Sequence, residues 1–75
     1  MELRSNRSAL GISQSRLARL SGVSRFKICT FELGSSSLTA EEQRRIRLTL
    51  EAEADRLLSA AAKINLDHSD LSERT

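Results

Sequence analysis

The sequence predicts an all-α domain of three short helices followed by one long C-terminal helix. The 75 residues include no proline and only two aromatic side chains, which disfavours a β-sandwich or a barrel. Each of the three glycines follows a short segment in which apolar residues recur at helical spacing. From Thr39 to about Leu66 the chain then continues with neither glycine nor proline, which predicts a helix about 40 Å long.

The first helix is predicted at residues 2–10. Leu3 and Leu10 lie two helical turns apart, so they share one face. Gly11 ends this helix at the position where a left-handed conformation is easiest to reach. Ile12 is then expected to contact the core.

The second helix is predicted to follow Ser13, whose hydroxyl can accept a hydrogen bond from a free amide of the first turn. Leu17, Ala18 and Leu20 are expected to face inward, and the small Ala18 lets the next helix cross closely. Gly22 lies at the corner between the helices, where a positive φ suits glycine and strains other residues.

The third helix is predicted at residues 24–33, with Ser24 as its N-cap, and its outward face is unusually apolar. Ile28 and Phe31 turn inward, so the helical period places Phe26 on nearly the opposite side. An aromatic side chain there favours a contact with a partner over a place in the core. The same outward face also carries Cys29, Thr30 and Leu33, with Arg25 and Lys27 on its flanks.

Residues 14–32 together have the pattern of a helix-turn-helix, whose second helix enters the major groove of DNA. The charge distribution agrees with this interpretation. Residues 1–38 carry six basic and two acidic side chains, a net charge of +4, whereas residues 39–75 carry six basic and eight acidic ones, a net charge of −2. Phosphate attraction is expected from Lys27, Arg16 and Arg19, although charge alone is equally compatible with a solvated surface.

The long helix is predicted to begin at Thr39, which with Glu42 has the form of a capping box. Ile46 and Leu50 are expected to pack on the core. Residues 51–66 extend beyond any core that three short helices can build, and their apolar residues follow a heptad spacing that predicts dimerisation. Fraying or folding back of this end is the alternative, and residues 67–75 are predicted to form a flexible tail. The dimerisation set comprises Leu50, Ala54, Leu57, Leu58, Ala61 and Ile64.

The spaced residues of this chain resemble the lambda Cro and phage-repressor type of helix-turn-helix, often called the xenobiotic-response-element family. The similarity covers about residues 2–50 and implies a DNA-binding domain at residues 1–50. Two departures stand out: one long helix replaces the family's usual fourth and fifth helices, and Ser21 occupies a position where an apolar residue is common. The residues that carry the resemblance are Ser13-Gln14, Leu17-Ala18, Gly22-Val23-Ser24, Ile28, and Glu32 followed by Gly34.

This resemblance implies roles for particular side chains. The third helix would be the recognition helix, and Arg7 would form a structural ion pair with Glu32. The side chains expected to reach base edges are Arg25, Phe26 and Thr30. Those expected to reach phosphates are Gln14 and Ser24, together with Ser35 and Ser36 of the following loop, in addition to Lys27 and Arg16.

These expectations converge on a homodimeric, sequence-specific regulator of transcription, most simply a repressor that reads a palindromic operator in double-stranded DNA. The alternative is an antitoxin or antirepressor-like module that binds a partner protein through the long helix. An enzyme is not expected, because the chain carries no metal-ligand cluster, glycine-rich phosphate loop or nucleophile–base pair, and no cofactor is implied. The single cysteine, Cys29, suits a cytoplasmic setting, and no apolar run predicts a membrane span.

Overall fold

The computed structural model describes the backbone of residues 2–74 and the side chains of residues 2–63. In that part of the chain four helices follow one another and no strand occurs: α1 (Leu3–Ala9), α2 (Gln14–Ser21), α3 (Arg25–Glu32) and α4 (Ala40–Arg74). The predicted all-α class, with three short helices before one long helix, is confirmed. The side chains of Ile64 and of the predicted tail, residues 67–75, lie outside the described residues.

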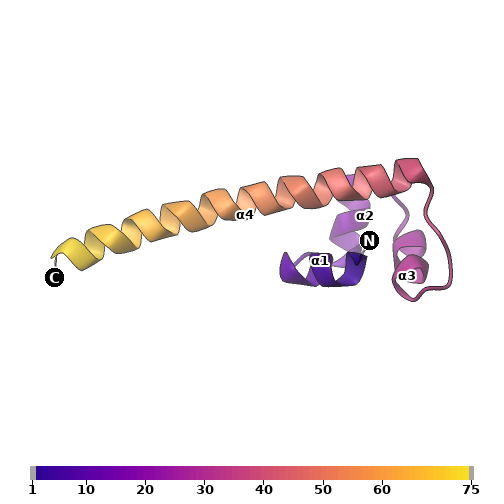
Figure 1. Ribbon diagram of the computed structural model, residues 1–75, viewed down its shortest axis with the longest axis horizontal. Coiled ribbons are helices and arrows are strands. Elements are labelled where there is room, and N and C mark those ends of the chain that lie inside the picture. Colours follow the sequence, from indigo (N-terminus) through magenta and orange to yellow (C-terminus); the bar gives the residue numbers. More distant parts are fainter. Residues whose placement is uncertain (1, 75) are drawn as a thin grey trace.

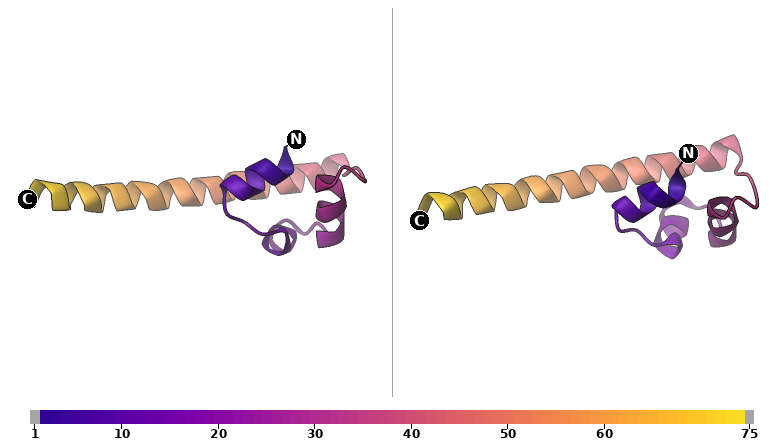
Figure 2. Two further views of the ribbon diagram at one scale, coloured as in Figure 1. Left: turned by 90° about the horizontal axis from the view of Figure 1, so that it is seen from below. Right: turned by 60° about the horizontal axis from the view of Figure 1, so that its bottom comes forward.

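The three short helices gather against the first part of α4, and the rest of α4 projects beyond them (Figure 1). The two further views in Figure 2 show the same arrangement. The molecule is consequently elongated, with extents of 55 × 19 × 18 Å.

The core is centred on one side chain from each of α2, α3 and α4. Leu17, Ile28 and Ile46 are fully buried. Burial of a leucine or isoleucine side chain stabilises a fold by about 1.5–3 kcal/mol, so these three are the main apolar contribution at the junction of the helices. Around them lie the buried Leu3, Ile12, Val23, Leu38 and Leu50, with Leu10, Ala18 and Phe31 packed at the edge.

The turn between α2 and α3 has the predicted capping and corner geometry. Ser13 is the N-cap of α2, and its hydroxyl accepts a hydrogen bond of 3.0 Å from the amide of Arg16. Gly22 has a φ of 75°, and its amide donates to the carbonyl oxygen of Ala18 at 2.9 Å. The left-handed corner ends α2 and turns the chain into α3.

The inner face of α2 differs from the prediction at one position. Leu20 was expected to face inward, but 47% of its surface is exposed. The reason is rotational: Leu17 and Ser21 are the buried residues of α2, and Leu20 lies about a quarter turn from the centre of that pair. The buried Ser21 hydroxyl donates to the carbonyl oxygen of Leu17 at 2.7 Å and accepts from the amide of Val23 at 3.3 Å. A serine at this position is therefore fully hydrogen-bonded rather than a packing defect.

The start of α4 is fixed by the predicted capping box. The Thr39 hydroxyl accepts from the amide of Glu42 at 3.1 Å, and the Glu42 carboxylate accepts from the amide of Thr39 at 2.9 Å. Leu38, just before the box, is buried, and its carbonyl oxygen accepts a hydrogen bond of 3.2 Å from the side chain of Gln43. Leu38 is a core residue that the helical pattern does not indicate, because it lies before the first residue of α4.

Past the core, α4 has no other helix beside it. Leu50 is 7% exposed and belongs to the core, whereas every side chain from residue 55 to residue 63 is exposed. Leu57 and Leu58 expose 38% and 68% of their surface. Of the predicted dimerisation set, Leu50 packs mainly within its own chain and Ala54 is partly buried, while Leu57, Leu58 and Ala61 are exposed.

Candidate nucleic-acid interface

The outward face of α3 is exposed and partly apolar. Ile28 is completely buried, and on the other side Phe26 exposes 75% of its surface. Leu33, the C-cap of the helix, exposes 71%, and Arg25 is also exposed. The position of Phe26 away from the core is confirmed. A large aromatic surface held in water on a well-packed helix marks a contact site more readily than a scattered exposed leucine does.

A shallow hollow beside this face brings together residues from the starts of α2 and α3. Gln14, Arg25, Phe26 and Cys29 line a volume of about 310 Å³. Two of the predicted base-contacting side chains and one predicted phosphate contact therefore lie around the same depression. Their chemistry is a guanidinium, an aromatic ring and an amide, which between them can meet a base edge, a thymine methyl group and a phosphate.

The carboxylate of Glu32 joins α1, α2 and α3 behind this face. The guanidinium of Arg7 donates to it through Nε at 2.8 Å and through Nη2 at 3.0 Å, so the predicted ion pair is present and bidentate. Arg7 also donates through Nη1 to the carbonyl oxygen of Ile12 at 3.0 Å, and Gln14 donates to Glu32 at 3.0 Å. Only 4% of the Glu32 side chain and 15% of that of Arg7 are exposed, so the pair is structural and is shielded from a ligand.

Ionisation of Glu32 is favoured by these neighbours. The hydrogen bonds from Arg7 lower the pKa of Glu32 below its ordinary value, burial opposes them, and the hydrogen bond from Gln14 adds to the lowering. The same pairing raises the pKa of Arg7. The network fixes the orientation of α3 relative to α1 and α2, and with it the direction in which Arg25 and Phe26 project.

The side-chain amide of Gln14 would donate two hydrogen bonds if it also contacts a phosphate. A side-chain amide has two N–H donors, and the bond to Glu32 uses one of them. The second donor is the one that the predicted phosphate contact requires. Because the amide is already held by Glu32, it would meet a phosphate without first losing rotational freedom.

Two of the predicted phosphate-binding cations, Lys27 and Arg16, are each paired with a carboxylate of α4. Lys27 contacts Glu42 at 2.6 Å, and Arg16 contacts Glu53 at 3.3 Å. The hydrogen bond from Lys27 is the largest influence that lowers the pKa of Glu42. About half of each cationic side chain is exposed, and exposed pairs contribute little to stability, so a phosphate can compete for both cations. Glu42 thus caps α4 and also pairs with Lys27, a second role that the capping pattern in the sequence does not indicate.

The remaining predicted contacts lie at the two ends of α3. Ser24 is the N-cap, but its side chain makes no capping hydrogen bond, which leaves the hydroxyl for another acceptor. At the other end, the Thr30 hydroxyl is 3.0 Å from the carbonyl oxygen of Phe26 and 2.7 Å from the Ser36 hydroxyl. This contact holds the loop against α3, as does the bond from the Ser35 amide to the Thr30 carbonyl oxygen at 2.8 Å. A base contact by Thr30 would thus use its methyl group.

Among the described residues, no group of three His, Cys, Asp or Glu side chains is arranged to hold a metal ion. No helix in that part of the chain combines the length and the apolar character needed to cross a bilayer. Comparisons with protein families, curated proteins and solved structures find no match to this chain.

Proposed function

We propose that this chain is a cytoplasmic, sequence-specific DNA-binding regulator of transcription that acts as a homodimeric repressor, with α3 as its recognition helix. The observation that carries the proposal is the exposure of Phe26 on a helix whose other side is fully buried at Ile28. The resemblance of residues 2–50 to the phage-repressor type of helix-turn-helix supports the same assignment.

The contacts in this proposal fall into two classes. Arg25 offers two parallel donors that match O6 and N7 of guanine, and Phe26 offers an apolar surface for a thymine methyl group. Lys27, Arg16 and the amide of Gln14 would meet phosphates, which fixes register and adds affinity without reading sequence. The second class includes the two cations held by α4 carboxylates, so DNA binding would exchange those ion pairs for phosphate contacts.

Selection of bound duplexes from a random pool tests this function. We expect the full-length chain to enrich one sequence motif and to retard it in a gel shift at salt near 150 mM. Failure to enrich any motif, with the protein folded by circular dichroism, would remove the proposal.

A protein-binding module is the second candidate function, and the exposure of Leu57 and Leu58 on the projecting part of α4 favours it. Under this alternative, a toxin-like or repressor-like partner covers that surface. Affinity purification from the native cell distinguishes the two: a stoichiometric protein partner together with no enriched DNA motif supports the module. The two functions can also coexist in one chain.

A further inference from the structure

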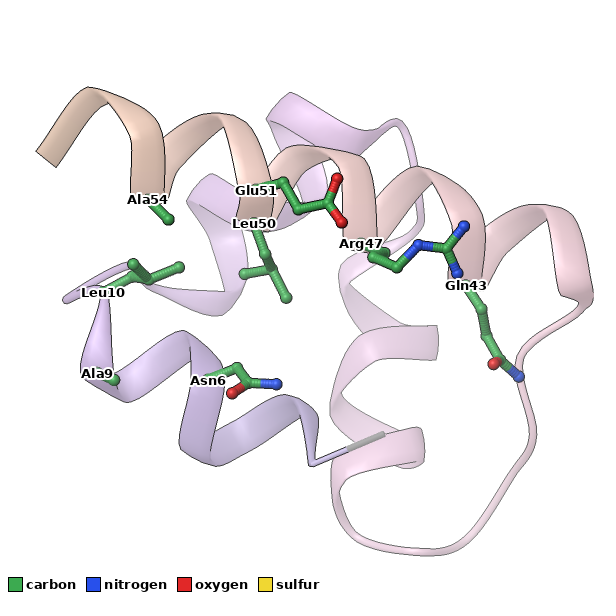
Figure 3. Close-up of a pocket in the computed structure, with 8 residues that line it drawn as sticks. All are labelled: Asn6, Ala9, Leu10, Gln43, Arg47, Leu50, Glu51 and Ala54. Carbon is green, nitrogen blue, oxygen red and sulfur yellow. The ribbon is translucent and has the colours of Figure 1, made fainter. Parts of the chain in front are cut away.

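A groove of about 470 Å³ separates α1 from α4 on the side of the molecule shown in Figure 3. Ala9 of α1 and its C-cap Leu10 form one wall, and Leu50 and Ala54 of α4 form the other, with polar side chains such as Arg47 along the edge. The centre of the groove is apolar, and its two walls belong to helices that are not in close contact there. Its apolar lining is of the kind on which another helix can pack.

The α4 wall of this groove continues directly into the exposed part of the same helix. Its lining residues follow the spacing 43, 47, 50 and 54, that is, four, three and four residues, and Leu57 and Ala61 extend it by three and four. A stripe with this period stays on one face of a helix. Up to Ala54 the stripe is opposed by α1, whereas beyond it the described side chains lie open to solvent.

We propose that the occupant of the groove is the projecting part of α4 from a second copy of this chain, running antiparallel. The stripe alternates large and small residues, Leu50, Ala54, Leu57 and Ala61. Antiparallel pairing places Leu50 against the partner's Ala61 and Ala54 against the partner's Leu57, so a large side chain meets a small one at every level. Parallel pairing would set leucine against leucine and alanine against alanine, which leaves gaps at the alanine levels.

The antiparallel arrangement also brings the uncovered part of each α4 helix against the groove of the other copy. Under this pairing residues 57–63 of one copy meet residues 48–54 of the other, and residues 57–63 have no helix of their own chain beside them. The two-fold axis passes between residues 55 and 56 and is perpendicular to the plane of the two α4 helices. Each copy therefore fills the groove of the other, and both apolar surfaces are covered by one isologous contact.

This pairing places the two recognition helices at a defined separation. The Lys27–Glu42 ion pair holds the start of α3 beside residue 42 of α4. Two such levels, each 13.5 residues from the axis, are about 40 Å apart at 1.5 Å per residue, close to the roughly 34 Å between half-sites one DNA turn apart.

The same two-fold axis also places the two recognition helices on one side of the dimer. Glu42 and Glu53, which contact α3 and α2, lie about a quarter turn around α4 from the groove stripe. Rotation about an axis perpendicular to the plane of the α4 pair leaves both helix-turn-helix units on the same side of that plane. The inferred dimer therefore presents two α3 helices toward one face of a duplex, and in this respect it rests on the proposed function.

Distances between spin labels test the pairing without any DNA. The labels are attached at Arg44→Cys or at Ser59→Cys, both at exposed positions outside the stripe, in a Cys29→Ser background. Antiparallel pairing predicts separations along the helix axis of about 35 Å for position 44 and about 10 Å for position 59. Pulsed electron–electron resonance on the full chain should therefore give a clearly longer distance at position 44 than at position 59.

Two results would overturn the inference. Similar short distances at both positions would mean parallel helices, and no dipolar coupling at either position would mean that a different partner covers the groove. The outcome is independent of the DNA selection. Antiparallel distances without an enriched motif would support the dimer and contradict the proposed function as a regulator. An enriched motif without dipolar coupling would support the regulator and contradict the antiparallel dimer.

Discussion

The body of the molecule, formed by α1–α3 and residues 40–54 of α4, contrasts with the projecting residues 55–63 in what its side chains contact. In the body Leu17 and Ile28 are fully buried, and Glu32 is held by three hydrogen bonds. In the projecting part every side chain is exposed, including Leu57 and Leu58. The body can fold from its own contacts, whereas a helical segment with no face packed against other residues is marginal in water and needs a partner to be well formed.

The contrast also separates two kinds of exposed apolar residue. Phe26 and Leu33 are exposed on a body whose packing is otherwise complete, so a ligand is the physical explanation for them. Leu57 and Leu58 are exposed because the chain supplies nothing to cover them, so a second polypeptide is the explanation there. The following substitutions test this division, from the largest expected effect to the smallest.

Truncation of a leucine to alanine should have a large effect on stability in the body and almost none in the projecting part. Leu17→Ala removes a fully buried side chain at the helix junction and should lower the free energy of unfolding by about 4 kcal/mol. Leu58→Ala, at a protein concentration too low for self-association, should change it by less than about 0.5 kcal/mol. Urea denaturation followed by circular dichroism measures both, and equal losses would contradict the division.

Loss of Arg7 should be the most damaging change of a charged residue. Arg7→Ala leaves the nearly buried Glu32 carboxylate without its main partner and should cost about 3 kcal/mol. The matched control is Arg56→Ala, which removes a cation that is 61% exposed from its pair with Glu53. A control variant as unstable as Arg7→Ala would show that the loss does not come from the burial of Glu32.

The pH dependence of stability should come partly from the same carboxylate. The pKa of Glu32 is lowered in the folded chain, so its contribution to stability is present above its ordinary pKa and is lost as the pH falls through that value toward the folded pKa. We expect the free energy of unfolding to fall between about pH 5 and pH 2, and to fall less steeply in Glu32→Gln. Identical slopes in the two proteins would assign the acid sensitivity to other groups.

A charge on the projecting stripe should separate the dimer without unfolding the body. Leu57→Glu places a carboxylate on the apolar stripe, and sedimentation equilibrium should then report a monomer. A cooperative urea transition followed by circular dichroism should show that the body is still folded. Ser59→Glu adds the same charge outside the stripe and should leave the dimer intact. A dimer that persists in Leu57→Glu would show that the stripe is not the contact.

Within the proposed interface, Arg25 should contribute to sequence preference, whereas Lys27 should contribute only to affinity. Arg25→Ala should cost about 1–3 kcal/mol of binding free energy at the selected operator and should relax the preference at one base pair in each half-site. Lys27→Ala should weaken binding to all duplexes about equally. It should also reduce the slope of the logarithm of affinity against the logarithm of salt concentration by about one, as expected for the loss of one phosphate contact. Gel-shift titrations at several salt concentrations measure both effects, and a Lys27→Ala protein with altered base preference would reverse the two roles.

Local sequence signals were sufficient to predict most of the fold. Ser13, Gly22 and the Thr39–Glu42 box mark helix boundaries through hydrogen bonds and φ values that depend on neighbouring residues only, and the structure has each of them. The burial of Ile28 and the exposure of Phe26 followed from the helical period. The Arg7–Glu32 pair was implied by the family resemblance, because its partners lie 25 residues apart and no local rule links them.

Features that depend on tertiary packing could not be predicted from the sequence. Leu20 shares the spacing of an inward residue but lies at the edge of the α2 contact with the core. The ion pairs of Lys27 and Arg16 with carboxylates of α4 depend on how α4 crosses α2 and α3. No sequence pattern within one helix encodes that crossing. The groove between α1 and α4 likewise requires the distance between two helices, although the stripe that continues from it was visible as a heptad spacing.

The central claim is that the outward face of α3 reads DNA sequence, and the most direct test repeats the random-pool selection with Arg25→Ala and Phe26→Ala. We predict that the wild-type chain enriches a palindrome with half-sites one turn apart, and that each variant loses preference at defined positions, symmetrically in both half-sites. Variants that enrich the same motif as the wild type with the same affinity would contradict the claim, because the side chains that define this face would then play no part in recognition.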